Sequence, residues 1–163
     1  MTALVEPDLR SVMLLSIRPR FVEQILAGTK TIELRRSRPA VESGQAVAIY
    51  STLPAGAIVA IARVVRVIEE RTNEFWRDYR SYAGVSRIEY DEYFRGRDTA
   101  VGIELADVTP LDLPIGLEQM RRRGVANAPQ QWHFLDRREW EDLPWETQTQ
   151  ATLPIRSVSH RAQ

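Results

Sequence analysis

The chain has 163 residues, of which 44% are hydrophobic and 27% charged, an ordinary globular composition that predicts a single domain with its own core. Its formal net charge is zero, so the chain as a whole lacks the strongly basic balance typical of nucleic-acid-binding proteins. The absence of cysteine excludes disulfides, a thiolate nucleophile and a cysteine zinc site, and two histidines argue against a multi-histidine metal centre. We therefore expect neither a metal nor a cofactor.

The apolar run near the start, VMLLSI, is too short for a signal peptide or a membrane span. We expect a soluble, cytoplasmic protein with no membrane partner, and the sequence indicates no oligomeric state. The predicted organisation is an N-terminal extension over 1–12, a domain over 13–143 and a C-terminal tail over 144–163. The tail lacks periodicity, which is compatible with partial disorder.

The predicted elements begin with a short buried strand over 13–17 and a helix that starts at Pro19 and ends at Gly28. KTIELR, residues 30–35, then alternates apolar and polar side chains with the period of a half-buried strand. Later strands are predicted over 46–51, 57–69 and 99–112, a helical pair over 72–84 and 86–94, and short helices over 116–124 and 137–142. Strands in series with inserted helices favour an α+β fold, with a mostly antiparallel, curved sheet forming a small barrel.

Positive charge is concentrated near the start of the domain. Between Arg10 and Arg38, seven basic residues stand against two acidic ones, an excess that could steer a phosphate-bearing ligand. Of the 22 basic residues in the chain, Lys30 is the only lysine, and all the others are arginine. Its place at the start of KTIELR, after a Gly-Thr turn, makes it a candidate for a specific role.

Four stretches between about residues 13 and 143 carry a family resemblance: LLSIRPRFVEQILAGTKTIELRR, SGQAVAIYST, AVGIEL and PQQWHFL. Together they resemble the ASCH domain family of the PUA-like superfamily. The resemblance implies a small β-barrel with helices flanking a cleft, in a protein that binds RNA or acts on nucleotides. The ligand-binding residues that it implies in this cleft are Ser16, Arg18, Lys30, Glu33 and Arg35.

A lysine differs from an arginine in being a compact charge whose pKa falls readily on burial, so Lys30 could act as a base, a nucleophile or a phosphate ligand. Pairing with Glu33 could set its protonation. We predict that Lys30 and Arg18 contact phosphate. Glu33 would accept a hydrogen bond from a base or orient Lys30, and Arg35 would brace Glu33 or reach the ligand. The alternative for Lys30 is a salt bridge that closes one end of the sheet.

The leading interpretation is an RNA- or nucleotide-binding protein with a basic cleft around Lys30, and an enzyme in the same cleft is the first alternative. A ribonuclease would use Lys30, Glu33 and Tyr50 as catalytic residues, with Ser51 beside them, through general acid–base chemistry and phosphate stabilisation. A hydrolase of acetylated nucleosides, implied for one branch of the family, has a threonine where this chain has Glu33. Trp132 is a further candidate ligand contact, because an aromatic ring can stack on a base.

Aromatic residues recur at helical spacing at Trp76, Tyr79 and Tyr82, and further aromatic residues follow at Tyr90 and Tyr93. We expect these side chains to pack the two helices together. An exposed aromatic surface would instead indicate a protein-interaction module, which is the second alternative function.

Overall fold

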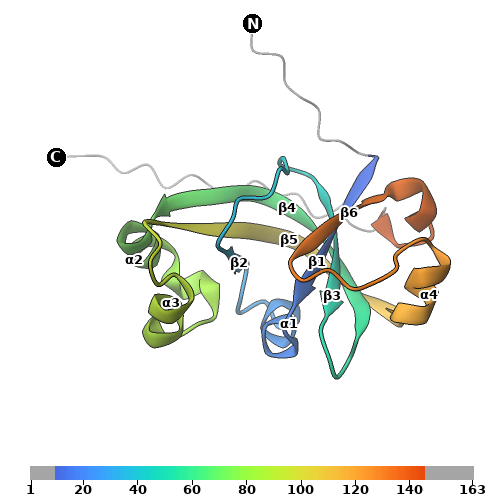
Figure 1. Ribbon diagram of the computed structural model, residues 1–163, viewed down its shortest axis with the longest axis horizontal. Coiled ribbons are helices and arrows are strands. Elements are labelled where there is room, and N and C mark those ends of the chain that lie inside the picture. The colour runs from blue at the N-terminus through green and yellow to red at the C-terminus, as the bar shows by residue number, and fades with distance from the viewer. Residues whose placement is uncertain (1–9, 146–163) are drawn as a thin grey trace, which may run out of the picture.

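The computed structural model describes residues 10–145, which form a six-stranded sheet in the order β2-β5-β4-β3-β1-β6 (Figure 1). The strands are β1 (Ser11–Ile17), β2 (Ile32–Arg35), β3 (Ala46–Ser51), β4 (Ala57–Arg71), β5 (Thr99–Gly116) and β6 (Trp132–Asp136). Neighbouring strands are antiparallel, except that β1 and β3 run parallel. The predicted α+β class and mostly antiparallel sheet are therefore confirmed.

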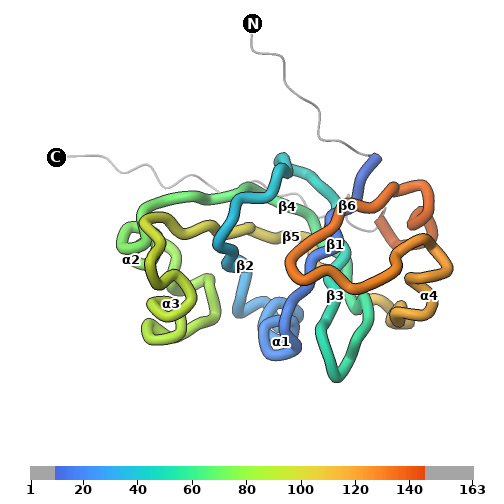
Figure 2. Tube along the Cα trace, viewed as in Figure 1, coloured from blue at the N-terminus to red at the C-terminus, as the bar shows by residue number. Residues whose placement is uncertain are grey.

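The sheet is open, so the expectation of a closed barrel is wrong. β2 and β6 form its two edges and do not pair with each other in the described part of the chain. The reason is the length of the β4–β5 ribbon, which Figure 2 shows as two traces running side by side. β3 pairs with residues 57–63 of β4, whereas β2 pairs with residues 101–104 of β5, which lie opposite the second half of β4. The two parts of the sheet are thus offset along the ribbon, which keeps the edges apart.

Irregular pairing bends this ribbon. The β4–β5 register shifts at three places along β4, and Asp107 on β5 adopts a positive φ of 53°. Bulges of this kind increase the local twist and bend the strand that carries them. The curvature therefore comes from the ribbon rather than from closure of the sheet.

The helices are α1 (Pro19–Leu26), α2 (Thr72–Ala83), α3 (Arg87–Tyr93) and α4 (Leu117–Arg122). α1 has proline in its first turn, as predicted, and α3 begins with the predicted capping box, in which Ser86 and Glu89 bond each other's backbone N–H groups. The last predicted helix, over 137–142, is only a single 3-10 turn, η1 (Arg137–Trp140).

The helical pair α2–α3 covers the end of the ribbon next to β2 (Figure 1). Its rings pack against one another: Tyr90 lies 4.9 Å from Trp76 and 4.8 Å from Phe94, measured between ring centroids. Phe75 is fully buried beneath them. Most of the aromatic residues therefore form a core of their own, as expected, but the prediction was wrong for Tyr82, which is 52% exposed and lies outside this core. A single exposed ring gives little of the aromatic surface that would favour an interaction module.

The C-terminal part contains a strand that the sequence analysis did not identify. β6 pairs with β1, and the segment that precedes β6 is thereby held against the end of β1. Trp140 and Trp145 are buried in the core beyond it, and the indole N–H of Trp145 donates to the carbonyl oxygen of Trp140 at 2.8 Å. Residues 1–9 and 146–163, which hold most of the predicted extension and tail, lie outside the described residues. Within residues 10–145, no helix has the length and apolar character needed to span a bilayer.

Candidate functional site

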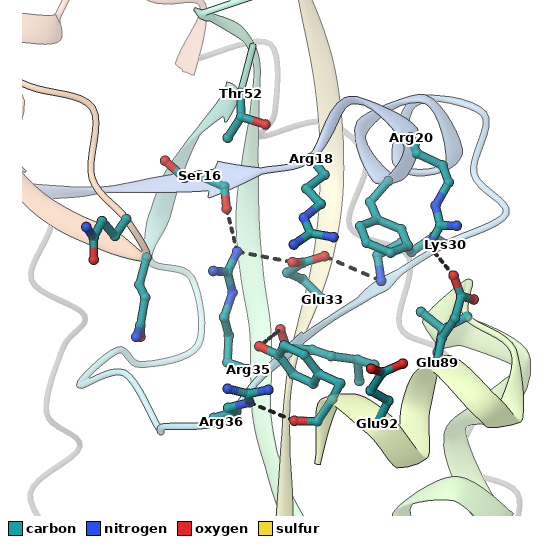
Figure 3. A pocket seen from close by; sticks show the side chains of 16 residues that line it. Ser16, Arg18, Arg20, Lys30, Glu33, Arg35, Arg36, Thr52, Glu89 and Glu92 are labelled. Atoms are coloured by element: carbon teal, nitrogen blue, oxygen red, sulfur yellow. Dashed lines mark hydrogen bonds and ion pairs between the residues drawn. The ribbon is translucent and has the colours of Figure 1, made fainter. Parts of the chain in front are cut away.

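A cavity of about 770 Å³ lies where the ends of β1 and β3 meet α1, β2, α3 and the segment before β6 (Figure 3). Its charged lining comprises five basic side chains and three acidic ones: Arg18, Arg20, Lys30, Arg35, Arg36, Glu33, Glu89 and Glu92. Phe21, Val85 and Tyr93 add apolar and aromatic surface. The volume lies within the range of small-molecule sites. The cavity is therefore large enough for a nucleotide.

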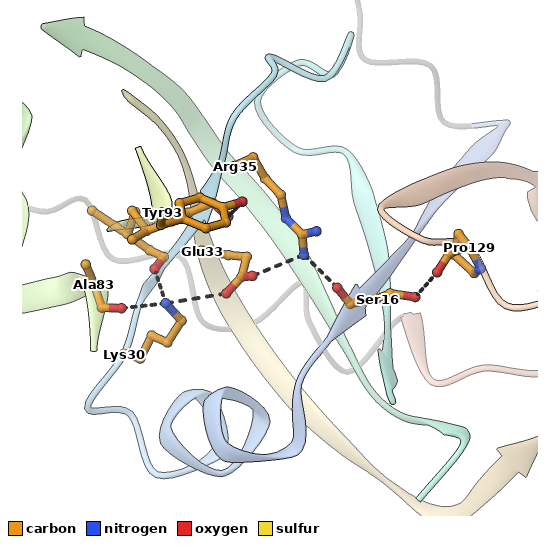
Figure 4. Close-up of polar contacts among 9 residues, drawn as sticks. Ser16, Lys30, Glu33, Arg35, Ala83, Tyr93 and Pro129 are labelled. Carbon is orange, nitrogen blue, oxygen red and sulfur yellow. Dashed lines mark hydrogen bonds and ion pairs between the residues drawn. The ribbon is translucent and has the colours of Figure 1, made fainter. Parts of the chain in front are cut away.

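Lys30 lies at the base of this cavity with only 2% of its surface exposed. Its ammonium donates to the carbonyl oxygens of Ile32, 2.8 Å away, and Ala83, 2.5 Å away (Figure 4). Oε2 of Glu33 is 3.4 Å from the same nitrogen. Two of the three N–H bonds of the ammonium are thus used by carbonyl oxygens, and Glu33 is its ion-pair partner. Burial lowers the pKa of Lys30, and the nearby Glu33 carboxylate opposes that shift.

Glu33 and Arg35 continue the same network. Nη2 of Arg35 donates to Oε1 of Glu33 at 3.1 Å and to the backbone carbonyl of Ser16 at 2.6 Å. The Glu33 carboxylate thus lies between two cations (Figure 3). Through Arg35, the network also ties β2 to β1, which are not neighbours in the sheet.

Both faces of β2 are buried, although the alternation of KTIELR predicted a half-buried strand. Ile32 and Leu34 pack in the core of the helical pair, and Glu33 and Arg35 are each only 7% exposed on the other face. The polar face is covered because β1, α1 and the segment before β6 close over it around the cavity. Alternation in a sequence shows which residues share a face, but it does not show whether a second layer covers the polar one.

Two polar atoms of this network have no hydrogen-bond partner among residues 10–145. They are Oε2 of Glu33 and Nε of Arg35, and both are fully shielded from solvent. Lys30 lies within ion-pair distance of Oε2, at 3.4 Å, without forming a hydrogen bond to it. Glu33 thus has one carboxylate oxygen, and Arg35 one guanidinium nitrogen, without a hydrogen-bond partner, and both residues line the cavity.

Ser16 lines the cavity and connects it to the C-terminal part of the chain. Its hydroxyl donates to the carbonyl of Pro129 at 2.6 Å, and its backbone N–H donates to the carbonyl of Gln131 at 3.0 Å. These bonds hold the segment before β6, so that Gln130 and Gln131 reach the cavity. The hydroxyl of Ser16 therefore anchors the wall of the site.

The arginines around the cavity differ in how they are held. Arg20 pairs with Glu89 at 2.6 Å, and Arg36 donates from Nε to the carbonyl of Tyr93 at 2.7 Å while its guanidinium lies 4.7 Å from that ring. Arg18 is exposed, and its side chain forms no ion pair or hydrogen bond with any residue that the structure describes. Among these three arginines, Arg18 is the one whose charge is not already engaged.

Three predicted site residues do not line the cavity. Tyr50, 5% exposed, packs in the core cluster that contains Ile58, and Ser51 is buried on the opposite face of β3. The cavity is instead reached by Thr52, the next residue. Trp132 packs on the core beneath β1, although Gln131 beside it does line the cavity.

The structure adds residues that sequence reasoning missed, above all Phe21, Tyr93, Gln130 and Gln131. Phe21 lies three residues after Arg18 in LLSIRPRFVEQILAGTKTIELRR, and its ring lies 4.8 Å from the Lys30 nitrogen. Gln130 and Gln131 belong to PQQWHFL, one of the stretches that carry the family resemblance, and Tyr93 was expected only to pack the two helices together. Within residues 10–145, no group of three or more His, Asp or Glu side chains is placed to hold a metal ion.

Both the sequence and the fold of this chain resemble those of known proteins. The ASCH domain family model matches residues 15–110. An ASCH domain-containing ribonuclease from Zymomonas mobilis is 30% identical over 138 residues, which cover 84% of this chain and 92% of that protein. The chain therefore belongs to the ASCH domain family.

Solved structures agree with this assignment. The crystal structure of ASCH from Zymomonas mobilis superposes with a TM-score of 0.75 at 28% identity, covering 80% of this chain and 91% of that one. A serine-to-alanine variant of the same protein gives a TM-score of 0.76 at 29% identity, covering 85% and 96% of the two chains. The similarity thus extends over nearly the whole of the related fold.

Proposed function

We propose that the chain binds RNA, or a nucleotide, in the cavity beside Lys30, Glu33 and Arg35. The observation that carries this proposal is the composition of that cavity, in which arginines at the rim surround aromatic side chains and a buried polar base. Arginine recognises phosphate, and aromatic surfaces accept unstacked bases. The ribonuclease activity in the name of the Zymomonas mobilis relative supports RNA as the ligand.

In this proposal Arg18 contacts phosphate and Lys30 acts indirectly. The Arg18 side chain is exposed and has no partner among the residues of the described range, so it can turn toward a ligand. The N–H bonds of Lys30, in contrast, are already directed at Ile32, Ala83 and Glu33. In this proposal Lys30 therefore positions the Glu33 carboxylate, in place of the phosphate contact that the sequence analysis predicted for Lys30.

Cleavage of the bound RNA is the second candidate function, favoured by the name of the relative that is 30% identical. General acid–base catalysis needs a titratable group within hydrogen-bond reach of the reacting atoms. Glu33 is a carboxylate in the cavity that could serve. Tyr50 and Ser51 would take part only if the substrate continued past Thr52 toward the β3–β4 turn, because neither residue lines the cavity itself.

The proposal is tested by fluorescence anisotropy of an end-labelled single-stranded RNA. Wild type is compared with Arg18→Ala and with the matched control Arg71→Ala, which removes another exposed arginine outside the cavity. We expect tight binding by wild type and the control, and binding that is several-fold weaker for Arg18→Ala. Equal binding by all three proteins, or none by wild type, would contradict the proposal.

The same samples are analysed on a denaturing gel to test for cleavage. Products that accumulate with wild type, and that Tyr50→Phe does not affect, would assign cleavage to the cavity. Loss of products in Tyr50→Phe with RNA binding retained would extend the site to the β3–β4 turn. Intact RNA after long incubation would leave binding alone as the function.

A further inference from the structure

The five basic side chains that line the cavity differ in whether a carboxylate neutralises them. Three lie within ion-pair distance of an acidic side chain of the same lining: Arg20, Lys30 and Arg35. The other two, Arg18 and Arg36, form no ion pair within residues 10–145. Over the whole lining, five basic and three acidic side chains leave an excess of two positive charges. The cavity therefore suits a ligand with two negative charges.

Arg36 is held in position while its terminal nitrogens stay available. Its Nε donates to the carbonyl oxygen of Tyr93 at 2.7 Å, and its guanidinium carbon lies 4.7 Å from the centroid of the Tyr93 ring. Neither contact supplies a negative charge, and neither Nη1 nor Nη2 has a hydrogen-bond partner within residues 10–145. The side chain is exposed, so a ligand can reach both nitrogens. A guanidinium held in this way can bind a phosphate through two parallel hydrogen bonds.

Arg18 and Arg36 stand apart in the cavity. Arg18 follows the end of β1 and Arg36 follows the end of β2, and these strands are not neighbours in the sheet. The whole side chain of Arg35 is needed to reach from β2 to the carbonyl of Ser16 on β1. Figure 3 shows the Glu33–Arg35 pair between the two arginines that lack a carboxylate. One phosphate group therefore cannot serve both of them equally well.

We propose that the cavity holds one nucleotide of an RNA strand with a phosphate on each side of its ribose, one bound by Arg18 and the other by Arg36. The ligand is then an internal nucleotide of a strand rather than a free nucleoside monophosphate. This assignment rests on the proposed function and deepens it, because it names the form of the ligand and adds a second phosphate contact.

The separation of the two arginines favours this ligand over a nucleoside diphosphate or triphosphate. The adjacent phosphates of those molecules lie on one side of the ribose and would meet the same arginine. In a strand, the ribose separates one phosphate from the next, which matches two cations that stand apart. Phe21 and Tyr93 add aromatic surface to the same cavity, against which the base of that nucleotide can lie.

The first test varies the position of the phosphates and uses the wild-type protein. Uridine 3′,5′-bisphosphate, uridine 5′-diphosphate and uridine 5′-triphosphate each compete against the labelled RNA. We expect the bisphosphate to compete roughly tenfold better than either of the others. Because the triphosphate carries more phosphate groups, their number cannot produce this order. Equal competition by the three nucleotides, or stronger competition by the triphosphate, would overturn the proposal.

The second test removes one of the two cations. In Arg36→Ala the bisphosphate should compete no better than the diphosphate. Arg38→Ala is the matched control, because Arg38 is exposed, lies two residues further along the chain and does not line the cavity, so this variant should keep the preference. A merely structural role for Arg36 would weaken all three nucleotides by the same factor, which would count against phosphate binding. Thermal unfolding establishes whether each variant is folded, and if Arg36→Ala is not, the comparison on wild type decides alone.

Failure of this proposal can be distinguished from failure of the proposed function. If RNA binds and Arg18→Ala weakens it, while the bisphosphate and the diphosphate compete equally, the proposed function stands and the pair of phosphate contacts is wrong. If neither RNA nor any of the three uridine nucleotides binds, both proposals fail.

Discussion

The ammonium nitrogen of Lys30 donates a hydrogen bond to the carbonyl oxygen of Ala83, 2.5 Å away and 53 residues later in the chain. Ala83 is the last residue of α2, where carbonyls lack partners within the helix and the helix dipole favours a positive charge. This bond and the bond to Ile32 connect the start of β2 to the helical pair. A buried nitrogen surrounded by three oxygens explains why lysine stands here in a chain that otherwise uses arginine.

We expect Lys30→Met to lower the free energy of unfolding by about 3–5 kcal/mol, because removing one partner of a buried ion pair leaves the other insufficiently compensated. It also leaves the carbonyl of Ala83 without its donor. Urea denaturation of the variant beside wild type measures the change. Arg18→Ala is the control and should stay within about 0.5 kcal/mol, as is usual for an exposed side chain. A change below about 1 kcal/mol for Lys30→Met would show that the network is not a major source of stability.

Gly102 lies in β5 where the sheet packs against α2, and we expect Gly102→Ala to be destabilising. A Cβ atom at this position would lie 2.6 Å from the side chains of both Ile32 and Phe75. Overpacking of a filled core costs about 1–3 kcal/mol. Thermal unfolding should therefore show a lower Tm for this variant.

The matched control is Gly116→Ala at the other end of the same strand. A Cβ atom there meets nothing within 4 Å, and φ is −74°, which any residue can adopt. Its unfolding free energy should change by less than about 1 kcal/mol. A Tm for Gly102→Ala equal to that of the control would mean that Ile32 and Phe75 can move aside at no cost.

The proposed phosphate contact of Arg18 predicts a specific salt dependence. For a single strand, each phosphate contact contributes about 0.7 to the slope of log affinity against log salt concentration. Anisotropy titrations at several salt concentrations should thus give a slope that is shallower by about 0.7 for Arg18→Ala than for wild type. If affinity fell while the slope stayed the same, Arg18 would act on the shape of the site rather than on phosphate.

Asp136 caps the single turn η1 and predicts a pH dependence at the acid end. Hydrogen bonds from the side chain and backbone N–H of Arg138 lower the pKa of Asp136 from 3.8 to about 2. The ionised carboxylate therefore stabilises the fold above about pH 4, and this contribution is lost as the pH falls through about 2. An NMR titration of the carboxyl carbon should show the lowered midpoint.

Arg138→Ala is the control for that titration. The variant removes the side-chain hydrogen bonds of Arg138, which are the largest cause of the lowered pKa of Asp136. It leaves the backbone N–H of residue 138, which donates to Oδ1 at 3.0 Å, so the midpoint should move only part of the way back toward 3.8. A midpoint that is unchanged in the variant would assign the shift to the backbone bond alone.

The sequence predicted most individual elements because their signals are local. Pro19 at the start of α1, the capping box at Ser86 and the β-branched run of β4 each depend on neighbours only a few residues away. β6 was missed, and it has no comparable signal, since its residues alternate only weakly and its place is set by pairing with β1. The closed barrel was wrong because closure depends on which part of the ribbon each strand pairs with.

By itself, the sequence determined that Glu33 and Arg35 share the polar face of one strand, because alternate residues of a strand point to the same side. Only the tertiary structure decided that Lys30, which precedes this strand, joins them in one buried network held between Ala83 and Ser16, which lie 53 residues after Lys30 and 19 residues before Arg35. It also decided that Tyr50 faces the core rather than the cavity. Burial and hydrogen bonding between distant segments depend on how layers pack, and this is the reason that a local pattern could name candidate residues without showing which of them line the cavity and which lie in the core.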